Sequence, residues 1–77
     1  MINRVQVKMA RAALGWGVRD LASKAGVAAN TVSRYENGAD ALGDTLARIQ
    51  RALEDAGAIF IDQNEDSGPG VRLKDPI

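Results

Sequence analysis

Glycines divide the first part of the chain into short segments, and this feature constrains the fold more than any other. They stand at positions 15, 17, 26, 38 and 57 of the 77-residue chain. Between them, apolar residues recur three or four positions apart, which is the spacing of one helix face. A glycine after such a segment provides the left-handed backbone conformation with which many helices end. The sequence therefore predicts four short helices, over residues 3–14, 18–25, 28–36 and 44–56.

The inner faces of these helices supply a small core. We expect Asn3 and Asp44 to cap the first and fourth helices, because their side-chain oxygens can accept hydrogen bonds from free N–H groups of the first turn. We expect Trp16 to pack at a helix junction. The residues predicted to face inward are Val7, Ala10, Leu14, Leu21, Ala22, Ala25, Val32, Tyr35, Leu46, Ile49 and Leu53.

After Gly57 the sequence changes character. Residues 58–61 are apolar and β-prone, residues 63–70 are polar and rich in turn formers, and residues 71–73 alternate between apolar and polar. This pattern predicts a β-hairpin. Because an isolated two-stranded hairpin is barely stable in water, it must pack on the helices, pair with a second chain, or do both.

Composition excludes several classes of function. The chain contains no Cys and no His, so disulfides and the usual ligands of a structural zinc site are absent. It has no glycine-rich phosphate loop and no metal-ligand cluster, and its adjacent acidic residues have the pattern of solvated surface. We therefore expect no catalysis, no metal and no cofactor, and no small-molecule ligand is evident. No apolar run approaches the roughly 18 residues of a membrane span, so we expect a cytoplasmic protein.

The net charge is zero, but its distribution is uneven. Residues 1–53 contain eight basic and four acidic side chains, giving +4, and residues 54–77 contain two basic and six acidic ones, giving −4. A basic body with an acidic tail is compatible with binding to nucleic acid.

Residues 18–38 contain the strongest signal. They hold two short helices joined by a tight turn at Gly26, with a small Ala22 that lets the helices approach and Val27 and Val32 to fill the angle between them. This geometry projects the second helix from the body, as entry into the major groove of DNA requires.

Here the sequence resembles the lambda-repressor/Cro (XRE) type of helix-turn-helix regulators over about residues 5–56. The resemblance implies a four-helix lambda-repressor-like DNA-binding domain over residues 1–57, followed by the C-terminal β-hairpin of residues 58–77. The positions that match are Arg11, Gly15, Leu21, Ala22, Gly26, Val27, Val32, Glu36, Asn37 and Gly38.

The resemblance also implies roles for individual residues. Ala29, Asn30 and Arg34 occupy positions that read base edges. Arg11 and Glu36 occupy positions that commonly form an ion pair, which would orient the recognition helix. The residues expected to contact phosphate are Arg19, Lys24, Ala28, Thr31, Ser33 and Asn37, with Arg4 and Lys8 adding positive charge.

The sequence departs from the family in its polar contacts. The second helix commonly begins with Ser or Thr and then Gln, where this chain has Gly17 and Val18. The recognition helix commonly begins with Ser or Thr and then Gln or Arg, where this chain has Ala28 and Ala29.

Two functions therefore stay open. We favour a sequence-specific regulator of transcription, with repression as its role, that acts on double-stranded DNA at the nucleoid. The alternative is an antitoxin-like or accessory protein-interaction module with little DNA affinity.

A homodimer is the expected assembly. One short helix-turn-helix reads few base pairs, whereas a two-fold dimer places two recognition helices about 34 Å apart. Ile59, Phe60 and Ile61 form an apolar strand whose edge a second chain could extend. The alternative is that the hairpin only covers the helices of its own chain.

Overall fold

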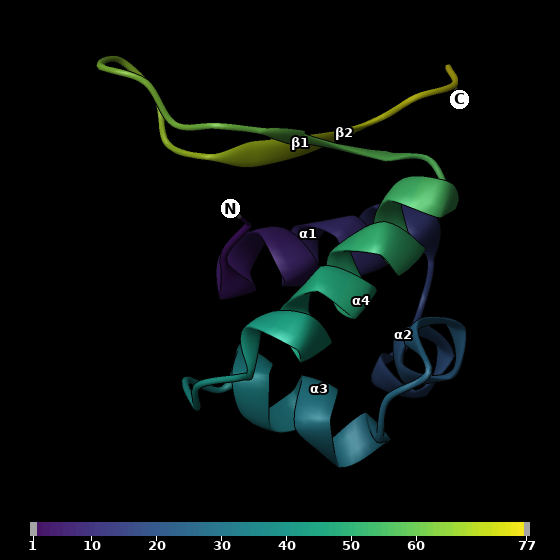
Figure 1. The fold of residues 1–77 in the computed structure, drawn as a ribbon. Helices are drawn as coiled ribbons and strands as arrows, with labels where there is room; N and C mark the ends of the chain where they lie inside the picture. The colour runs from purple at the N-terminus through teal and green to yellow at the C-terminus, as the bar shows by residue number, and fades with distance from the viewer. Residues whose placement is uncertain (1, 77) are drawn as a thin grey trace.

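The fold is mainly α, with four helices followed by a two-stranded hairpin, as predicted (Figure 1). A computed structural model describes residues 2–76. The helices are α1 (Arg4–Leu14), α2 (Val18–Ala25), α3 (Ala29–Glu36) and α4 (Gly43–Asp55), and the strands are β1 (Ala58–Ile61) and β2 (Gly70–Leu73).

The helix ends follow local chemistry, with one clear error in the prediction. Asn3 caps α1 as expected, since its Oδ1 accepts a hydrogen bond from the Gln6 N–H at 2.9 Å. The Gln6 Oε1 in turn accepts one from the Asn3 N–H at 3.1 Å. The prediction that Asp44 caps α4 is wrong, because α4 begins at Gly43 and Leu42 is its cap. Asp44 instead lies in the first turn, where its carboxylate is favoured by the helix dipole.

Other boundaries differ from the prediction by one residue, among them the start of the third helix and the start of the second strand. The third helix begins at Ala29, with Ala28 as the cap residue in an extended conformation. The second strand begins at Gly70, because this residue pairs with Ile61 where the connecting loop begins and ends.

Every helix contributes to one core. Val7, Leu21, Val32, Ile49 and Leu53 are fully buried, and together they come from all four helices. Leu14 and Trp16 are half-buried and pack against this core. The helical spacing therefore located the core correctly, although it did not indicate that Ile2, Ala52 and Ala58 are also buried.

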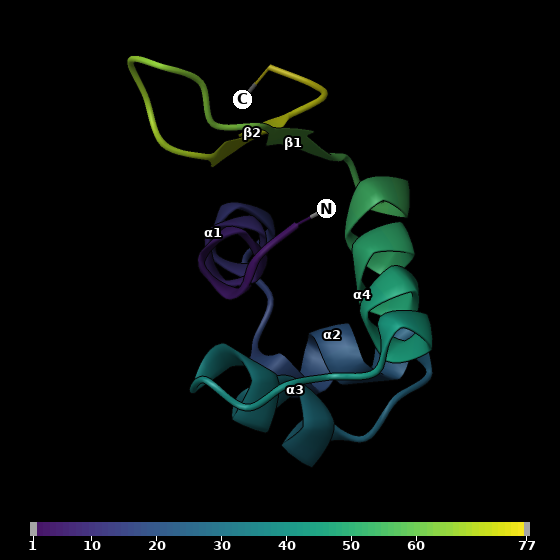
Figure 2. The same cartoon turned by 60° about the vertical axis from the view of Figure 1, so that its left-hand side comes forward.

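The recognition helix and the hairpin lie at opposite ends of the molecule. Figures 1 and 2 show α2 and α3 at the lower end, the hairpin at the upper end, and α1 and α4 between them. The strand β1 packs on α1 and α4, and β2 packs mainly on α1. The fold therefore separates α3 from the hairpin by the lengths of α1 and α4.

The hairpin is antiparallel, and its two faces differ. Phe60 lies opposite Val71, and both are half-buried against the helices. Ile59 lies opposite Arg72 on the outer face, and both residues are exposed. A buried side chain of α1 holds the loop end of the hairpin, since the Gln6 Nε2 donates hydrogen bonds to the carbonyls of Ile61 and Gly70, each at 3.1 Å.

Candidate nucleic-acid interface

A tight turn fixes α3 against α2. Gly26 ends α2 with a φ of 71°, a left-handed conformation that side chains rarely adopt. The Val27 N–H donates to the Ala22 carbonyl at 3.0 Å, which closes the turn. Leu21 of α2 and Val32 of α3 are fully buried and hold the two helices together on their inner faces. The angle of α3 is therefore set by backbone geometry and packing.

The residues of α3 that were predicted to read bases differ in how far they are exposed. Asn30 and Arg34 are both exposed, and they share a face because they lie four residues apart. Ser33 and Thr31 are half-exposed, and Ala28 and Asn37 at the two ends of the helix are exposed. Ala29 is only half-exposed because its methyl group packs partly on the core. It is therefore a smaller contact surface than the sequence suggested.

The C-terminal end of α3 is attached to α1 by an ion pair. The Arg11 Nε and Nη2 donate to the Glu36 Oε2 and Oε1, each at 2.6 Å, and Glu36 is 6% exposed. The hydrogen bond to Glu36 raises the pKa of Arg11 above its ordinary value, although burial acts in the opposite direction. A third bond joins the Arg11 Nη1 to the Trp16 carbonyl at 3.1 Å. Arg11 and Glu36 thus form the pair that the resemblance implies.

A second arginine of α1 supports the same end of α3. The Arg4 Nε donates to the Tyr35 carbonyl at 3.0 Å, and its Nη2 donates to the Ala39 carbonyl at 3.3 Å. Its guanidinium lies 5.2 Å from the centre of the Tyr35 ring. We expected Arg4 to neutralise phosphate, but these contacts direct it to the protein's own backbone. The sequence gives no sign of them, because the partners lie more than thirty positions away.

The comparison with known families agrees with this geometry. The profile of the helix-turn-helix family matches residues 7–54, which is more than half of the chain. The chain belongs to the lambda-repressor/Cro (XRE) type of helix-turn-helix proteins. It is thus a DNA-binding helix-turn-helix domain by family. No curated protein matches the chain.

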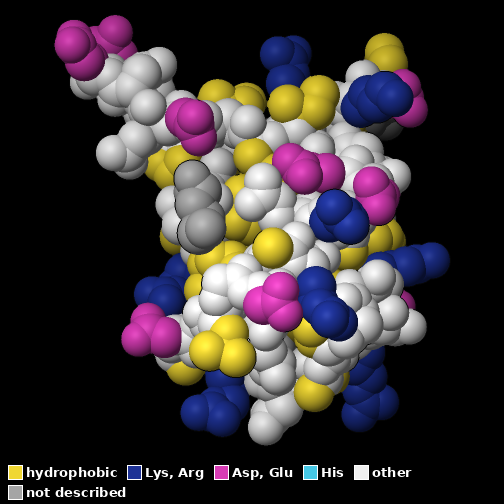
Figure 3. All heavy atoms as spheres, viewed as in Figure 1, with side chains coloured by type: hydrophobic (Ala, Val, Ile, Leu, Met, Phe, Trp, Pro, Cys, Tyr) yellow, Lys and Arg dark blue, Asp and Glu magenta, His cyan; other side chains and the backbone are white. Residues whose placement is uncertain are grey.

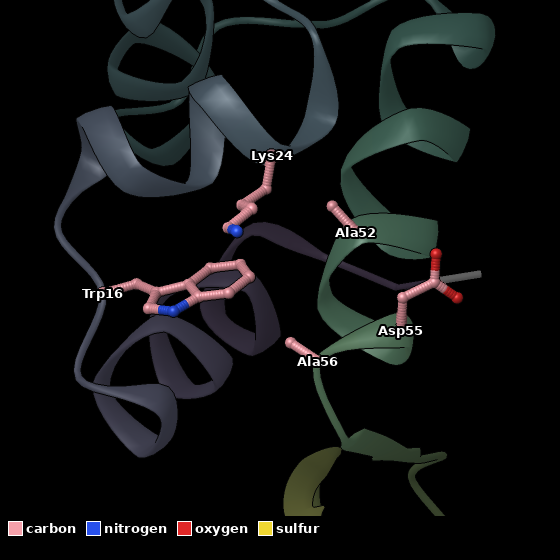
Figure 4. A pocket seen from close by; sticks show the side chains of 5 residues that line it. All are labelled: Trp16, Lys24, Ala52, Asp55 and Ala56. Carbon is pink, nitrogen blue, oxygen red and sulfur yellow. The ribbon is translucent and has the colours of Figure 1, made fainter.

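Positive charge gathers near the helix-turn-helix. In Figure 3, the charged side chains at the lowest part of the molecule are Lys and Arg, while most Asp and Glu side chains lie higher, towards the hairpin. Arg19 of α2 and Lys8 of α1 are exposed, as phosphate contacts must be. Lys24 is exposed too, but it points towards Trp16 in a hollow of about 250 Å³ between α2 and α4 (Figure 4). The structure therefore does not bring Lys24 to the outer face of the recognition helix.

The start of α2 carries its own anion. The Asp20 Oδ2 accepts a hydrogen bond from the Gly17 N–H at 2.8 Å, in the first turn of the helix. Helix N-termini favour negative charge, so this carboxylate occupies a place that a DNA phosphate could otherwise use. Because Asp20 occupies the Gly17 N–H and Val18 is apolar, a phosphate contact at this end of α2 depends on the side chain of Arg19.

The residues predicted at a subunit contact lie at the far end. Ile59 and Ile61 are each 43% exposed on the outer face of β1. Phe60 faces the helices of its own chain and is half-buried, so its side chain is not presented to a partner.

The structure also bears on metals and membranes. Within residues 2–76, no group of three or more His, Cys, Asp or Glu side chains is placed to hold a metal ion. No helix in the same range is long and apolar enough to cross a membrane.

Proposed function

We propose that the protein is a transcriptional regulator that binds specific sequences of double-stranded DNA through α3. The observation that carries this proposal is the pair of exposed readers, Asn30 and Arg34, on a helix whose direction is fixed from behind by Arg11 and Arg4. Reading bases requires a rigid helix with polar side chains on its outer face, and α3 has both.

The proposed contacts follow from side-chain chemistry. Arg34 suits a bidentate contact to guanine, and Asn30 suits one to adenine, while Ala29 offers a small apolar contact to a thymine methyl group. Phosphate contacts fall to the exposed or half-exposed polar groups around α3. These are Arg19, Thr31, Ser33 and Asn37, with the backbone of Ala28 and, after a change of rotamer, Lys24.

Repression is the proposed role. A small domain that occupies a promoter competes directly with the transcription machinery, without a further activity. The proposed place of action is the nucleoid in the cytoplasm, where such DNA lies. No step of this role calls for a cofactor, a metal ion or a catalytic residue.

The test begins with selection of bound duplexes from random DNA, followed by titration of the selected site. We expect Arg34→Ala to weaken binding to this site about 5- to 150-fold, the range for loss of one bidentate base contact. Arg72→Ala serves as the matched control, because Arg72 is an exposed arginine on the hairpin at the far end of the molecule. Equal binding by the wild type and Arg34→Ala would contradict the proposed reader.

The second candidate, a protein-interaction module, is favoured by the apolar residues Val18 and Ala28 and by the Asp20 carboxylate. All three lie where phosphate contacts would strengthen DNA binding. The same titration separates the two candidates. The titration is made at a low and a high salt concentration. Specific DNA binding survives competitor DNA and weakens steeply as salt rises, whereas an interaction module gives no saturable binding at either concentration.

We further propose a division of labour in which residues 1–57 bind DNA and residues 58–77 join two copies into a dimer. The two-fold arrangement matters for DNA. Copies placed side by side in one continuous sheet would keep both α3 helices on the same side of the sheet. Copies stacked through their outer hairpin faces would turn these helices in opposite directions. A duplex that contacts both helices requires the first arrangement, and sedimentation of the full chain measures whether a dimer forms.

A further inference from the structure

A hollow beside the recognition helix brings an acidic side chain next to the proposed guanine reader. It measures about 260 Å³ and is lined by Thr31 and Arg34 of α3, Asp40 and Leu42 of the following loop, and Thr45 of α4. Arg34 and Asp40 are both exposed. The lining of this hollow therefore carries one positive group, from α3, and one negative group, from the loop that follows it.

The two charges are neighbours but do not form an ion pair. Among residues 2–76, oppositely charged side chains approach within 4.0 Å of each other at Arg11 and Glu36. Neither Arg34 nor Asp40 takes part in that ion pair. The guanidinium of Arg34 is thus available to a ligand, while the carboxylate of Asp40 stands beside it.

The rest of the loop offers no compensating positive charge. Residues 37–42 contain no Lys and no Arg. Leu42 is 77% exposed and has no hydrogen-bond donor on its side chain. A DNA strand that passes over this loop therefore meets the Asp40 carboxylate, and the neighbouring cation is Arg34 of α3 rather than a residue of the loop.

We propose that Asp40 is a specificity-determining residue that acts through Arg34. A phosphate that approaches Arg34 from the rim of the hollow carries a full negative charge and is repelled by Asp40. The O6 and N7 atoms of guanine carry only partial charges and lie within the groove, so the same repulsion penalises the base contact less. Asp40 thereby weakens binding to random DNA more than binding to the preferred site. This inference rests on the proposed DNA-binding function.

The test compares Asp40→Asn with the wild type by fluorescence anisotropy. One probe is the duplex obtained by selection, and the other is a random-sequence duplex of equal length. We expect affinity for the random duplex to rise about threefold, as expected for removing one unit-charge repulsion several ångströms away in water. Affinity for the selected duplex should rise less, so the ratio of the two affinities falls. In Asp40→Lys, a new phosphate contact should steepen the dependence of log affinity on log salt by about 0.9.

Asp66→Asn and Asp66→Lys are the matched controls. They change the net charge equally, but Asp66 is exposed in the hairpin loop at the opposite end of the molecule. We expect both to leave the ratio of affinities unchanged.

A double-mutant cycle shows whether Asp40 acts through Arg34. In an Arg34→Ala background, Asp40→Asn should no longer raise affinity for the random duplex. Persistence of the gain in that background would overturn the proposal, and so would equal ratios for Asp40→Asn and Asp66→Asn. These outcomes differ from failure of the proposed function, in which the wild type itself binds neither duplex and both proposals fall.

Discussion

The two ends of the molecule are both attached to α1, but by different chemistry. At the recognition-helix end, two arginines of α1 hold α3 with charge-assisted contacts, Arg11 to the Glu36 carboxylate and Arg4 to backbone carbonyls. At the hairpin end, the neutral amide of Gln6 holds β1 and β2 through two carbonyls. Charge-assisted hydrogen bonds are roughly twice as strong as neutral ones. The difference indicates that the fold fixes the position of α3 more firmly than the position of the hairpin.

This difference matches what each end has to do. A helix that reads base edges must hold its side chains within a fraction of an ångström of their partners. A hairpin that covers a core, or pairs with a second copy, tolerates small shifts. Three perturbations test whether the two ends differ as the contacts indicate.

The largest effect is expected at the α3 end. Glu36→Ala leaves Arg11 partly buried without its partner, and such a loss costs about 3 kcal/mol in the free energy of unfolding. Urea unfolding measures this value. Glu54→Ala is the control, because Glu54 is exposed on α4 and its change should cost less than about 0.5 kcal/mol. A loss below about 1 kcal/mol for Glu36→Ala would remove the asymmetry between the ends.

An intermediate effect is expected from Gln6. Gln6→Glu preserves the shape and the acceptor that caps α1, but it replaces the donor to Ile61 and Gly70 with a carboxylate oxygen that faces their carbonyls. We expect a loss of about 2 kcal/mol, typical of an unsatisfied buried polar group. The same urea experiment measures it, with Gln63→Glu in the exposed hairpin loop as the control. If Gln6→Glu costs more than Glu36→Ala, the hairpin is the more firmly held end.

The smallest effect concerns the outer face of the hairpin. The double variant Ile59→Glu with Ile61→Glu should weaken dimerisation at least about tenfold, because it places charge next to the proposed subunit contact. Analytical ultracentrifugation of the full chain measures the dissociation constant. Val5→Glu with Met9→Glu is matched in charge and exposure, since these apolar residues of α1 are 51% and 41% exposed. If the double variant at Val5 and Met9 dissociates the dimer and the one at Ile59 and Ile61 does not, the subunit contact lies on α1 and not on the hairpin.

The same contrast explains what could be predicted from the sequence. The helices, the turn at Gly26 and the core depend on local conformation and apolar spacing, both of which can be read from neighbouring residues. The roles of Gln6 and Arg4 depend on backbone carbonyls that lie 55 and 31 residues away in the chain. A carbonyl is present at every residue, so nothing in the pattern distinguishes these partners. The position of Asp40 beside Arg34 depends similarly on the path of the loop after α3.

The side chain of Gln6 joins two structural events that would otherwise be separate. Its Oε1 accepts a hydrogen bond in the first turn of α1, and its Nε2 donates hydrogen bonds to the hairpin. Fraying of that turn releases the hairpin, and release of the hairpin exposes the turn. The N-terminal and C-terminal segments should therefore open together, and hydrogen exchange of their amides should give a common free energy of opening.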